Sequence, residues 1–165
     1  GDTIDKYLET EWIFENPVLI EIGPVEPGQM IGIEDIETMS VPARVDLLLI
    51  KTGFGRRRKE PLYAQRNPGF EPELADWLRA EFPGLHMIGF DCISVSSYAH
   101  RDIGRAAHRA FLENERPLLL LEDADLCSVG AETVIEKVIV APLRVLGADA
   151  APCTVLAWIK DSARS

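Results

Sequence analysis

Two histidines, His100 and His108, and a cluster of carboxylates lie between residues 98 and 126. His108 belongs to a segment whose spacing predicts a helix, and the apolar run 117–121 predicts a buried strand that ends at Glu122 and Asp123. Imidazole nitrogens and carboxylate oxygens are both ligands of divalent metals. The pattern supports two interpretations: a metal site where the helix meets the strand end, or an amphipathic helix with a solvated histidine followed by a core strand with surface acids.

The rest of the chain must supply a scaffold for this helix and strand. Apolar, β-branched runs bounded by glycine or proline predict strands, and apolar residues at helical spacing predict helices. The predicted strands are 17–22, 45–52, 85–91, 117–121, 134–146 and 153–159; the predicted helices are 33–39, 71–82 and a segment from 98 that carries His100 and His108; 3–12 is a short helical turn, 28–32 and 67–70 are turns, and a basic loop follows residue 53. This order predicts a mixed α/β fold, with helices packed against a mixed sheet.

Composition argues against several classes of protein. The 165 residues suffice for one domain, and 47% hydrophobic with 27% charged residues is typical of a globular chain. The formal net charge of −10 disfavours a nucleic-acid partner, and the basic run 56–59 is interpreted as a solvated turn. We expect no membrane partner, since the apolar runs are too short to cross a bilayer, and without a secretory signal the expected location is cytoplasmic.

Other chemistries lack a motif. There is no glycine-rich phosphate-binding loop and no Gly-x-Ser-x-Gly nucleophile elbow. Cys92, Cys127 and Cys153 lie far apart, which favours neither a disulfide framework nor a structural zinc site. Cys92 and Cys153 are predicted to be small buried hydrophobes in apolar surroundings.

Several blocks occur in an order that resembles a known family. The blocks are LLLIKTGFG, NPGF followed by PELADWL, IGFD, GRAAHRAFL and LLLEDADL. Together they are similar to the C-terminal two-thirds of the cyclase family, which contains kynurenine formamidases (arylformamidases) and related metal-dependent hydrolases. The resemblance implies a swivelling β/β/α fold with a mixed, partly barrel-like sheet and flanking helices. It also implies that residues 1–165 belong to a single cyclase-like domain.

The resemblance also implies a ligand set and a reaction. His108 matches a metal-ligating histidine and Glu122 a metal-ligating carboxylate, with Asp123 as the alternative carboxylate because the spacing is about two residues longer here. The metal would be zinc or manganese, and the substrate a small-molecule amide or formamide that metal-activated water hydrolyses. Asp91 and the loop 94–97, which begins with Ser94, would orient ligands as second-shell groups, although a strand-ending aspartate also commonly caps a turn.

One part of the family pattern does not occur in these residues. The signature His-x-Gly-Thr-His-x-Asp is absent from the sequence, and in the family it lies upstream of the segment that matches Thr3. Because His108 and Glu122 are fewer than the three protein ligands of a typical catalytic zinc, we expect weak or no metal binding by this chain alone. His100 is expected to line the pocket or to be solvated.

Two hypotheses follow. The chain belongs either to an active amide hydrolase whose remaining ligands are encoded upstream, or to a non-catalytic relative that acts as a binding or assembly module; a hydrolase of a cyclic amide is a further possibility within the family. We also expect a homo-oligomer, as the resemblance implies. Trp12, Phe14 and Phe54 could serve its interface, or they could equally be core residues.

Overall fold

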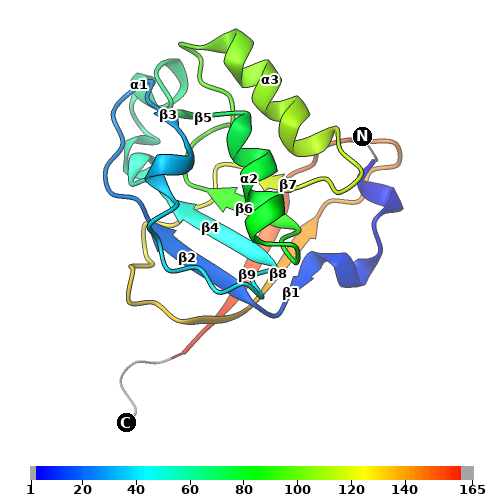
Figure 1. The fold of residues 1–165 in the computed structure, drawn as a ribbon. Helices are drawn as coiled ribbons and strands as arrows, with labels where there is room; N and C mark the ends of the chain where they lie inside the picture. The colour runs from blue at the N-terminus through cyan, green and yellow to red at the C-terminus, as the bar shows by residue number, and fades with distance from the viewer. Residues whose placement is uncertain (1–2, 161–165) are drawn as a thin grey trace.

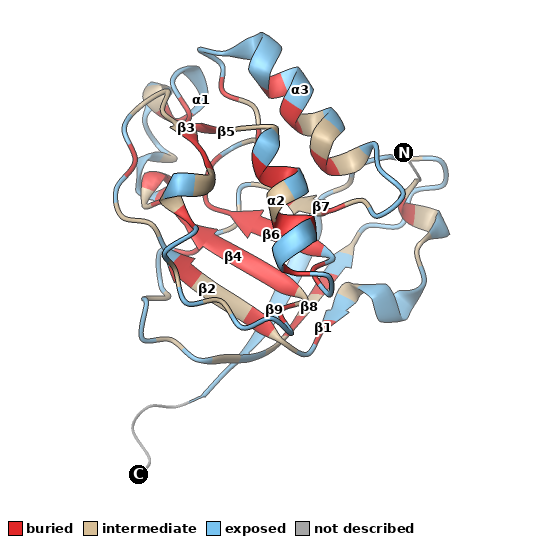
Figure 2. Ribbon diagram, viewed as in Figure 1, coloured by how far each residue is buried: buried red, intermediate tan, exposed pale blue. Residues whose placement is uncertain are grey.

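The fold is built around a parallel sheet of four strands, β2 (Pro17–Glu21), β4 (Leu47–Lys51), β6 (Met87–Phe90) and β7 (Leu119–Leu121), in the order β2-β4-β6-β7. The computed structural model describes residues 3–160. β4 and β6 are buried along their whole length, as expected for parallel strands that are covered on both faces (Figure 2). The four predicted strands that form this sheet are confirmed, each one to three residues shorter than predicted.

The two faces of this sheet are covered differently. Helices α2 (Glu73–Glu81) and α3 (Arg101–Leu112) cover one face, where they pack on Leu48 and Ile50. The other face packs Leu47 and Leu49 against an antiparallel sheet of β1 (Ile13–Phe14), β8 (Ile135–Pro142) and β9 (Cys153–Ile159). Because neighbouring residues of a strand point to opposite faces, β4 contributes to both hydrophobic cores. The layers are visible in Figure 1, where α2 lies in front of β4 and β6 while β8 and β9 lie behind.

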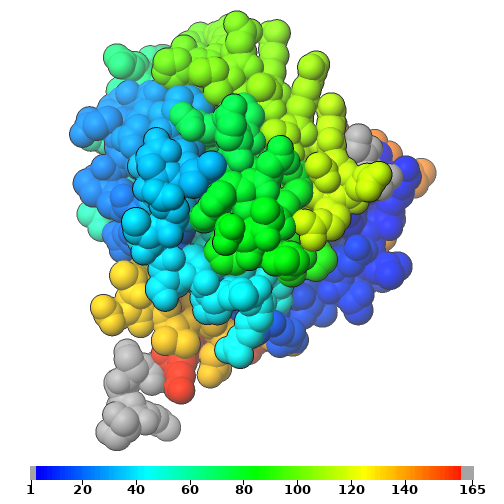
Figure 3. All heavy atoms as spheres, in the orientation of Figure 1, coloured from blue at the N-terminus to red at the C-terminus, as the bar shows by residue number. Residues whose placement is uncertain are grey.

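Helices α2 and α3 lie side by side and form much of the surface seen in Figure 3. Arg79 of α2 joins them: its buried guanidinium donates to the carbonyls of Phe111, at the end of α3, and Arg116. A buried cation is tolerated here because backbone carbonyls satisfy its donors. The orientation of α3 over the end of β7 is therefore held from its C-terminal end.

Short elements connect these layers. β3 (Met30–Ile31) and β5 (Gly69–Phe70) form a parallel pair. The remaining elements are the 3₁₀ helices η1 (Ile4–Lys6), η2 (Glu9–Trp12), η3 (Ile33–Asp35) and η4 (Phe54–Arg57), and helix α1 (Pro61–Gln65).

Several sequence-based expectations are corrected. The helix predicted at 33–39 is only the single turn η3, and the turns predicted at 28–32 and 67–70 contain β3 and β5. The basic stretch after β4 contains η4 and α1 where a loop was predicted, because long-range contacts described below hold it. Local propensity carries no information about such contacts.

The three aromatic residues proposed for an interface differ in how far they are buried. Phe14 and Phe54 are buried in the core, which is one of the two alternatives left open for them, and Trp12 is half-buried. Cys92 is buried as predicted, whereas Cys153 on β9 is exposed, which corrects the second cysteine. Its exposure follows from its strand, since every residue of β9 is exposed.

Among residues 3–160, β9 forms the outer edge of its sheet. It is bonded to β8 on one side and is the last strand of its sheet (Figure 1), and Figure 2 shows it as a continuous exposed strand. Within residues 3–160, no helix combines the length and apolar character that a membrane crossing requires.

Candidate functional site

His108 and Glu122 meet at the carboxyl end of β7. His108 lies on the second half of α3, and Glu122 is the first residue after the strand. The Nε2 atom of His108 lies 3.6 Å from Oε1 of Glu122, and both side chains are partly exposed. The packing of α3 across the sheet therefore brings together the two residues that the resemblance selected as metal ligands.

The partners of the His108 ring determine where its proton lies. Nδ1 is 3.2 Å from the backbone carbonyl of Gly104 and 2.8 Å from the hydroxyl of Ser96. A carbonyl only accepts hydrogen bonds, whereas a hydroxyl either accepts or donates, so these contacts favour the neutral tautomer with the proton on Nδ1 and a free lone pair on Nε2. The lone pair then faces Glu122.

Glu122 is held from the opposite side by the loop that follows β6. Its Oε1 accepts a hydrogen bond from the backbone N–H of Val95 at 2.8 Å and from the hydroxyl of Ser94 at 3.2 Å. Ser94 in turn accepts from the N–H of Ser96, so one loop orients both His108 and Glu122. The second-shell function that the resemblance implied for Ser94 is consistent with this contact.

The neutral imidazole and the carboxylate present acceptor to acceptor, an arrangement that a proton or a cation must bridge. Nitrogen and oxygen donors of this kind suit zinc or manganese. Among residues 3–160, however, no group of three or more His, Cys, Asp or Glu side chains could hold a metal ion. His108 and Glu122 therefore fit a divalent metal as two of its protein ligands and do not form a complete site from the described residues.

A cavity of about 920 Å³ opens beside this pair. His108, Glu122 and Asp123 line it on the side of α3 and β7, and residues of β8 and β9, including Val140 and Val155, line the opposite side. The cavity therefore lies between the central sheet and the antiparallel sheet, and its lining combines the polar side chains of His108, Glu122 and Asp123 with apolar residues of β7, β8 and β9. Such a space suits a small, mainly apolar ligand with one polar group.

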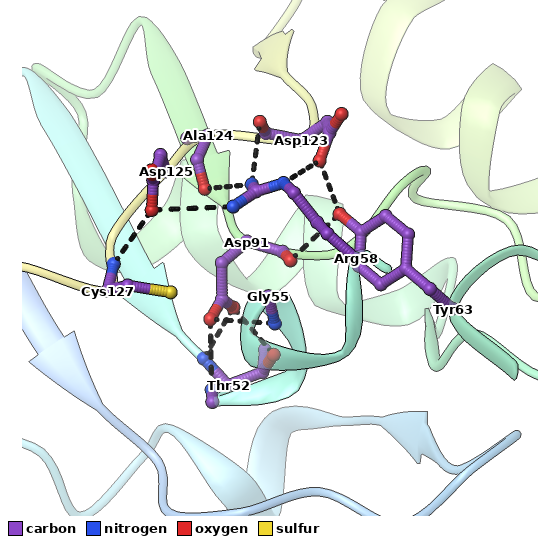
Figure 4. A network of polar contacts seen from close by, with 10 residues as sticks. Thr52, Gly55, Arg58, Tyr63, Asp91, Asp123, Ala124, Asp125 and Cys127 are labelled. Carbon is purple, nitrogen blue, oxygen red and sulfur yellow. Dashed lines mark hydrogen bonds and ion pairs between the residues drawn. The ribbon is translucent and has the colours of Figure 1, made fainter. Parts of the chain in front are cut away.

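Asp123 is engaged elsewhere, which favours Glu122 of the two alternative carboxylates. The Oδ1 atom of Asp123 accepts from Nε of Arg58 at 2.7 Å and from the hydroxyl of Tyr63 (Figure 4). Arg58 also donates through Nη2 to the carbonyls of Asp123 and Ala124 and pairs with Asp125. Arg58 is therefore not part of a solvated turn, which corrects the interpretation of the basic run 56–59.

Asp91 takes the turn-capping function of its two proposed alternatives. Its buried carboxylate accepts from the N–H groups of Thr52, Gly53 and Gly55 and from the Thr52 hydroxyl, at 2.6–3.3 Å. Figure 4 shows these bonds at the carboxyl end of β4, below the Arg58 network. Within the described chain the carboxylate is directed to this loop, and its link to the candidate site is indirect, through the strand that ends there.

His100 does not share the helix with His108, and that prediction is wrong. α3 begins at Arg101, and His100 precedes it as the N-cap residue with φ −130° and ψ 61°. Its side chain is exposed and lines neither of the two cavities described in residues 3–160, so the solvated alternative holds. His86 is likewise exposed, at the opposite end of β6 from the site.

The network around Asp123 changes the acidity of its members. Burial, followed by the hydrogen bond to Asp123, raises the pKa of the Tyr63 hydroxyl well above its ordinary value, so Tyr63 is a permanent donor. The backbone N–H of Cys127, with the charge of Arg58, lowers the pKa of Asp125. Burial lowers the pKa of Arg58, but the bond and charge of Asp123 outweigh it, and the pKa is raised overall. Tyr63 is therefore neutral, Asp125 negatively charged and Arg58 positively charged across the physiological pH range.

Sequence reasoning missed Arg58 and Tyr63, and it included Ser96 only as a member of the loop 94–97. The only local signal for Arg58 was the basic run, which commonly marks a solvated surface. Arg58 and Asp123 are 65 positions apart, and nothing in a single sequence reports that contact.

Comparison with known proteins places the fold. A family model described as "Cyclase: Putative cyclase" matches residues 1–97, a span that ends before His108 and Glu122. Isatin hydrolase A from Labrenzia aggregata, solved with benzyl benzoate, is similar over 94% of this chain with a TM-score of 0.72 and 22% identity. An isatin hydrolase bound to the product analogue thioisatinate is similar over 94% of the chain with a TM-score of 0.70 and 16% identity. The chain spans 64% and 63% of those two solved chains. No curated protein matches.

Proposed function

The chain belongs to the cyclase family, and from this premise we propose that it forms part of a metal-dependent hydrolase that cleaves the C–N bond of an amide. One observation carries the proposal: Nε2 of His108 and Oε1 of Glu122 converge to 3.6 Å, while the other ring nitrogen, Nδ1, contacts the Gly104 carbonyl and the Ser96 hydroxyl. Two acceptor atoms that face one another in this way would provide two of the protein ligands of a bound cation.

His108 and Glu122 would hold a divalent metal there, and the chemistry that such an ion would supply is a lowered pKa of a water that can attack an amide carbonyl. The residues of this chain have separate parts in that chemistry. His108 and Glu122 would be ligands of the ion, the N–H of Val95 and the hydroxyl of Ser94 keep the carboxylate in place, and the hydroxyl of Ser96 contacts the imidazole. The cavity beside them, at about 920 Å³, falls within the range of about 300–1,000 Å³ that is common for small-molecule sites.

We propose a small aromatic amide as the substrate, with an N-formyl arylamide such as N-formylkynurenine as the first candidate. A cyclic amide is the second candidate, and the likeness to two isatin hydrolases favours it. Both contain an aryl C–N bond next to a carbonyl, and the cavity lining includes apolar residues that suit the ring. Parallel assays with N-formylkynurenine and isatin distinguish the two.

The test combines metal content with activity in the protein as its gene encodes it. We expect stoichiometric zinc or manganese, hydrolysis of at least one of the two amides, and loss of both metal and activity in His108→Ala and Glu122→Gln. His86→Ala is the matched control, because His86 is an exposed histidine at the far end of β6. Activity that survives both His108→Ala and chelation would exclude this function.

The second candidate is a non-catalytic module, and the number of donors supports it, since the described residues supply two where a catalytic zinc commonly has three. The encoded sequence upstream of Gly1 separates the candidates. A His-x-Gly-Thr-His-x-Asp motif there would exclude the non-catalytic module. Its absence, together with no metal bound by the purified protein, would exclude the hydrolase.

We also propose a homo-oligomer that pairs β9 with β9 of a second copy. Seven uncharged residues form this free edge, and Leu156 and Trp158 are about half exposed. Antiparallel pairing about a two-fold axis would join the two sheets and cover these side chains. Light scattering should give a dimer for the parent and for Ile103→Lys, an exposed control on α3, and a monomer for Leu156→Lys. An unchanged mass for Leu156→Lys would exclude this interface.

A further inference from the structure

We propose that Arg58 and Tyr63 are positioning residues for the candidate site. Their hydrogen bonds to Asp123 hold the backbone turn that directs the Glu122 side chain toward His108. The inference deepens the proposed function and rests on it. It concerns residues that contact neither the cavity nor His108, and it predicts that they determine where the Glu122 carboxylate lies.

The backbone at Asp123 adopts the left-handed conformation. Its φ is +55°, and within residues 3–160 it is the only residue other than glycine with a positive φ. This left-handed conformation is unfavourable for a residue with a Cβ, although aspartate tolerates it better than most. The strand β7 therefore turns sharply after Leu121, and the turn sets the direction of Glu122, which precedes Asp123.

Hydrogen bonds from Arg58 and Tyr63 hold this turn. Arg58 binds it in a forked manner, with Nε on Oδ1 of Asp123 at 2.7 Å and Nη2 on the carbonyls of Asp123 and Ala124 at 2.9 and 2.7 Å. The hydroxyl of Tyr63 binds the same Oδ1 and lies 3.1 Å from the carbonyl of Asp91 (Figure 4). We call Arg58, Tyr63 and Asp123 the clamp. A planar fork of donors imposes geometry as well as binding, which a lysine does not do.

Backbone hydrogen bonds connect the clamp to the candidate site. The N–H of Asp123 donates to the carbonyl of Cys92 at 2.8 Å, and the N–H of Ala124 donates to that of Phe90 at 2.9 Å. The turn is thus fixed to the loop after β6, three residues before Val95, whose N–H donates to Oε1 of Glu122. If Asp123 leaves the left-handed conformation, Glu122 loses its alignment with both Val95 and His108.

The Val95–Glu122 hydrogen bond gives a direct readout that needs no metal. Hydrogen exchange of the Val95 amide, measured by NMR on the purified protein, reports whether the Glu122 carboxylate is in place. The Leu49 amide in β4 serves as the reference for global stability, and Glu122→Ala gives the exchange rate of Val95 without its acceptor. A purely structural function of the clamp would change the protection of Val95 and Leu49 in parallel.

A matched pair of variants isolates the turn. Asp123→Gly and Asp123→Ala both remove the carboxylate, but only glycine adopts a positive φ without strain. We expect the protection of Val95, relative to Leu49, to be about tenfold lower in Asp123→Ala than in Asp123→Gly. Tyr63→Phe should lower this ratio in the parent and lower it less in Asp123→Gly, where the bond to Asp123 is already absent and only the bond to the Asp91 carbonyl is lost. Arg58→Lys should lower it, since a lysine cannot reproduce the fork.

The second measurement is zinc affinity, determined by competition with a chelator on the protein as its gene encodes it. In the parent, Arg58→Lys and Asp123→Ala should weaken zinc binding by about 10–100-fold, the usual effect of losing an outer-shell partner. Equal protection of Val95 in Asp123→Ala and Asp123→Gly, or a parallel change at Leu49, would overturn the inference while leaving the proposed function intact. A parent without His108-dependent zinc binding would overturn the proposed function, and with it the purpose assigned to the clamp.

Discussion

The Oγ atom of Ser96 lies 2.8 Å from Nδ1 of His108, and the carbonyl of Gly104, one helical turn before His108, lies 3.2 Å from the same nitrogen. The ring is therefore fixed both from the loop after β6 and from within α3. Since Nε2 is thereby left to face Glu122, this pair of contacts determines which atom is presented to the cavity.

Removal of the Ser96 hydroxyl should weaken the site without unfolding the protein. In Ser96→Ala the carbonyl of Gly104 still holds the proton on Nδ1, so we expect a loss in zinc affinity near the lower end of the usual range, about tenfold. A chelator competition titration measures it, with exposed Ser40→Ala as the control. An affinity equal to that of the parent would show that the hydroxyl does not orient the ring.

Gly104→Ala should destabilise the protein, although this substitution in a helix normally adds about 1 kcal/mol of stability. A Cβ at position 104 would lie 2.6 Å from both Cβ and Oγ of Ser96, closer than packed atoms allow. We expect a lower melting temperature and weaker zinc binding, because Ser96 must move away from His108. The exposed Ala106→Gly measures the ordinary helix propensity in the opposite direction. A melting temperature above the parent's would contradict the close approach.

Asp91→Asn should cost roughly 2–4 kcal/mol in the free energy of unfolding. The carboxylate accepts bonds from the Thr52 hydroxyl and from three backbone N–H groups of residues 52–55, and a side-chain amide would turn a donor toward some of them. Denaturant titration measures the change, and exposed Asp102→Asn serves as the control. A loss below 0.5 kcal/mol, on the order of an ordinary surface substitution, would show that this cap is dispensable.

The stability gain from Glu71→Gln should depend on pH. Burial, and then the negative charges of Glu34, Glu73 and Asp35, raise the pKa of Glu71 above its ordinary value of 4.5. A raised native pKa means that the folded state holds the proton more tightly, so the ionised Glu71 destabilises the fold at neutral pH and the penalty disappears as pH falls below 4.5. Thermal melts should show a higher melting temperature for Glu71→Gln at pH 7 and no difference near pH 4. An equal gain at both pH values would contradict this electrostatic origin.

Cys92 should resist alkylation in the native protein. Burial raises the pKa of its thiol from 9.0 to about 12, so the thiolate that reacts is almost absent at pH 8.5. The exposed Cys127 should react with iodoacetamide first, and Cys92 only after unfolding, as peptide mass spectrometry can follow. The raised pKa also makes stability depend on pH. The thiol ionises near pH 9 in the unfolded chain but only near pH 12 in the folded protein, so the contribution of Cys92 to the free energy of unfolding declines as pH rises from 9 toward 12. Early labelling of Cys92 would contradict its burial.

The sequence by itself determined the elements whose pattern is local. Continuous apolar runs such as LLLIK identify the buried parallel strands, and the 3.6-residue period identifies α2 and most of α3, because burial on two faces or on one stripe requires these spacings. A meeting of a helix histidine with a strand-end carboxylate was one of two interpretations of the sequence, and the family resemblance named His108 with Glu122 or Asp123.

Only the tertiary structure decided which carboxylate faces the histidine. Glu122 and Asp123 are adjacent and chemically similar, and their directions depend on a left-handed turn that Arg58 and Tyr63 hold from more than 55 positions away. Asp91 likewise received its function from Thr52, 39 positions earlier. A one-dimensional pattern reports burial and period, whereas the orientation of a side chain depends on contacts between segments that the fold brings together.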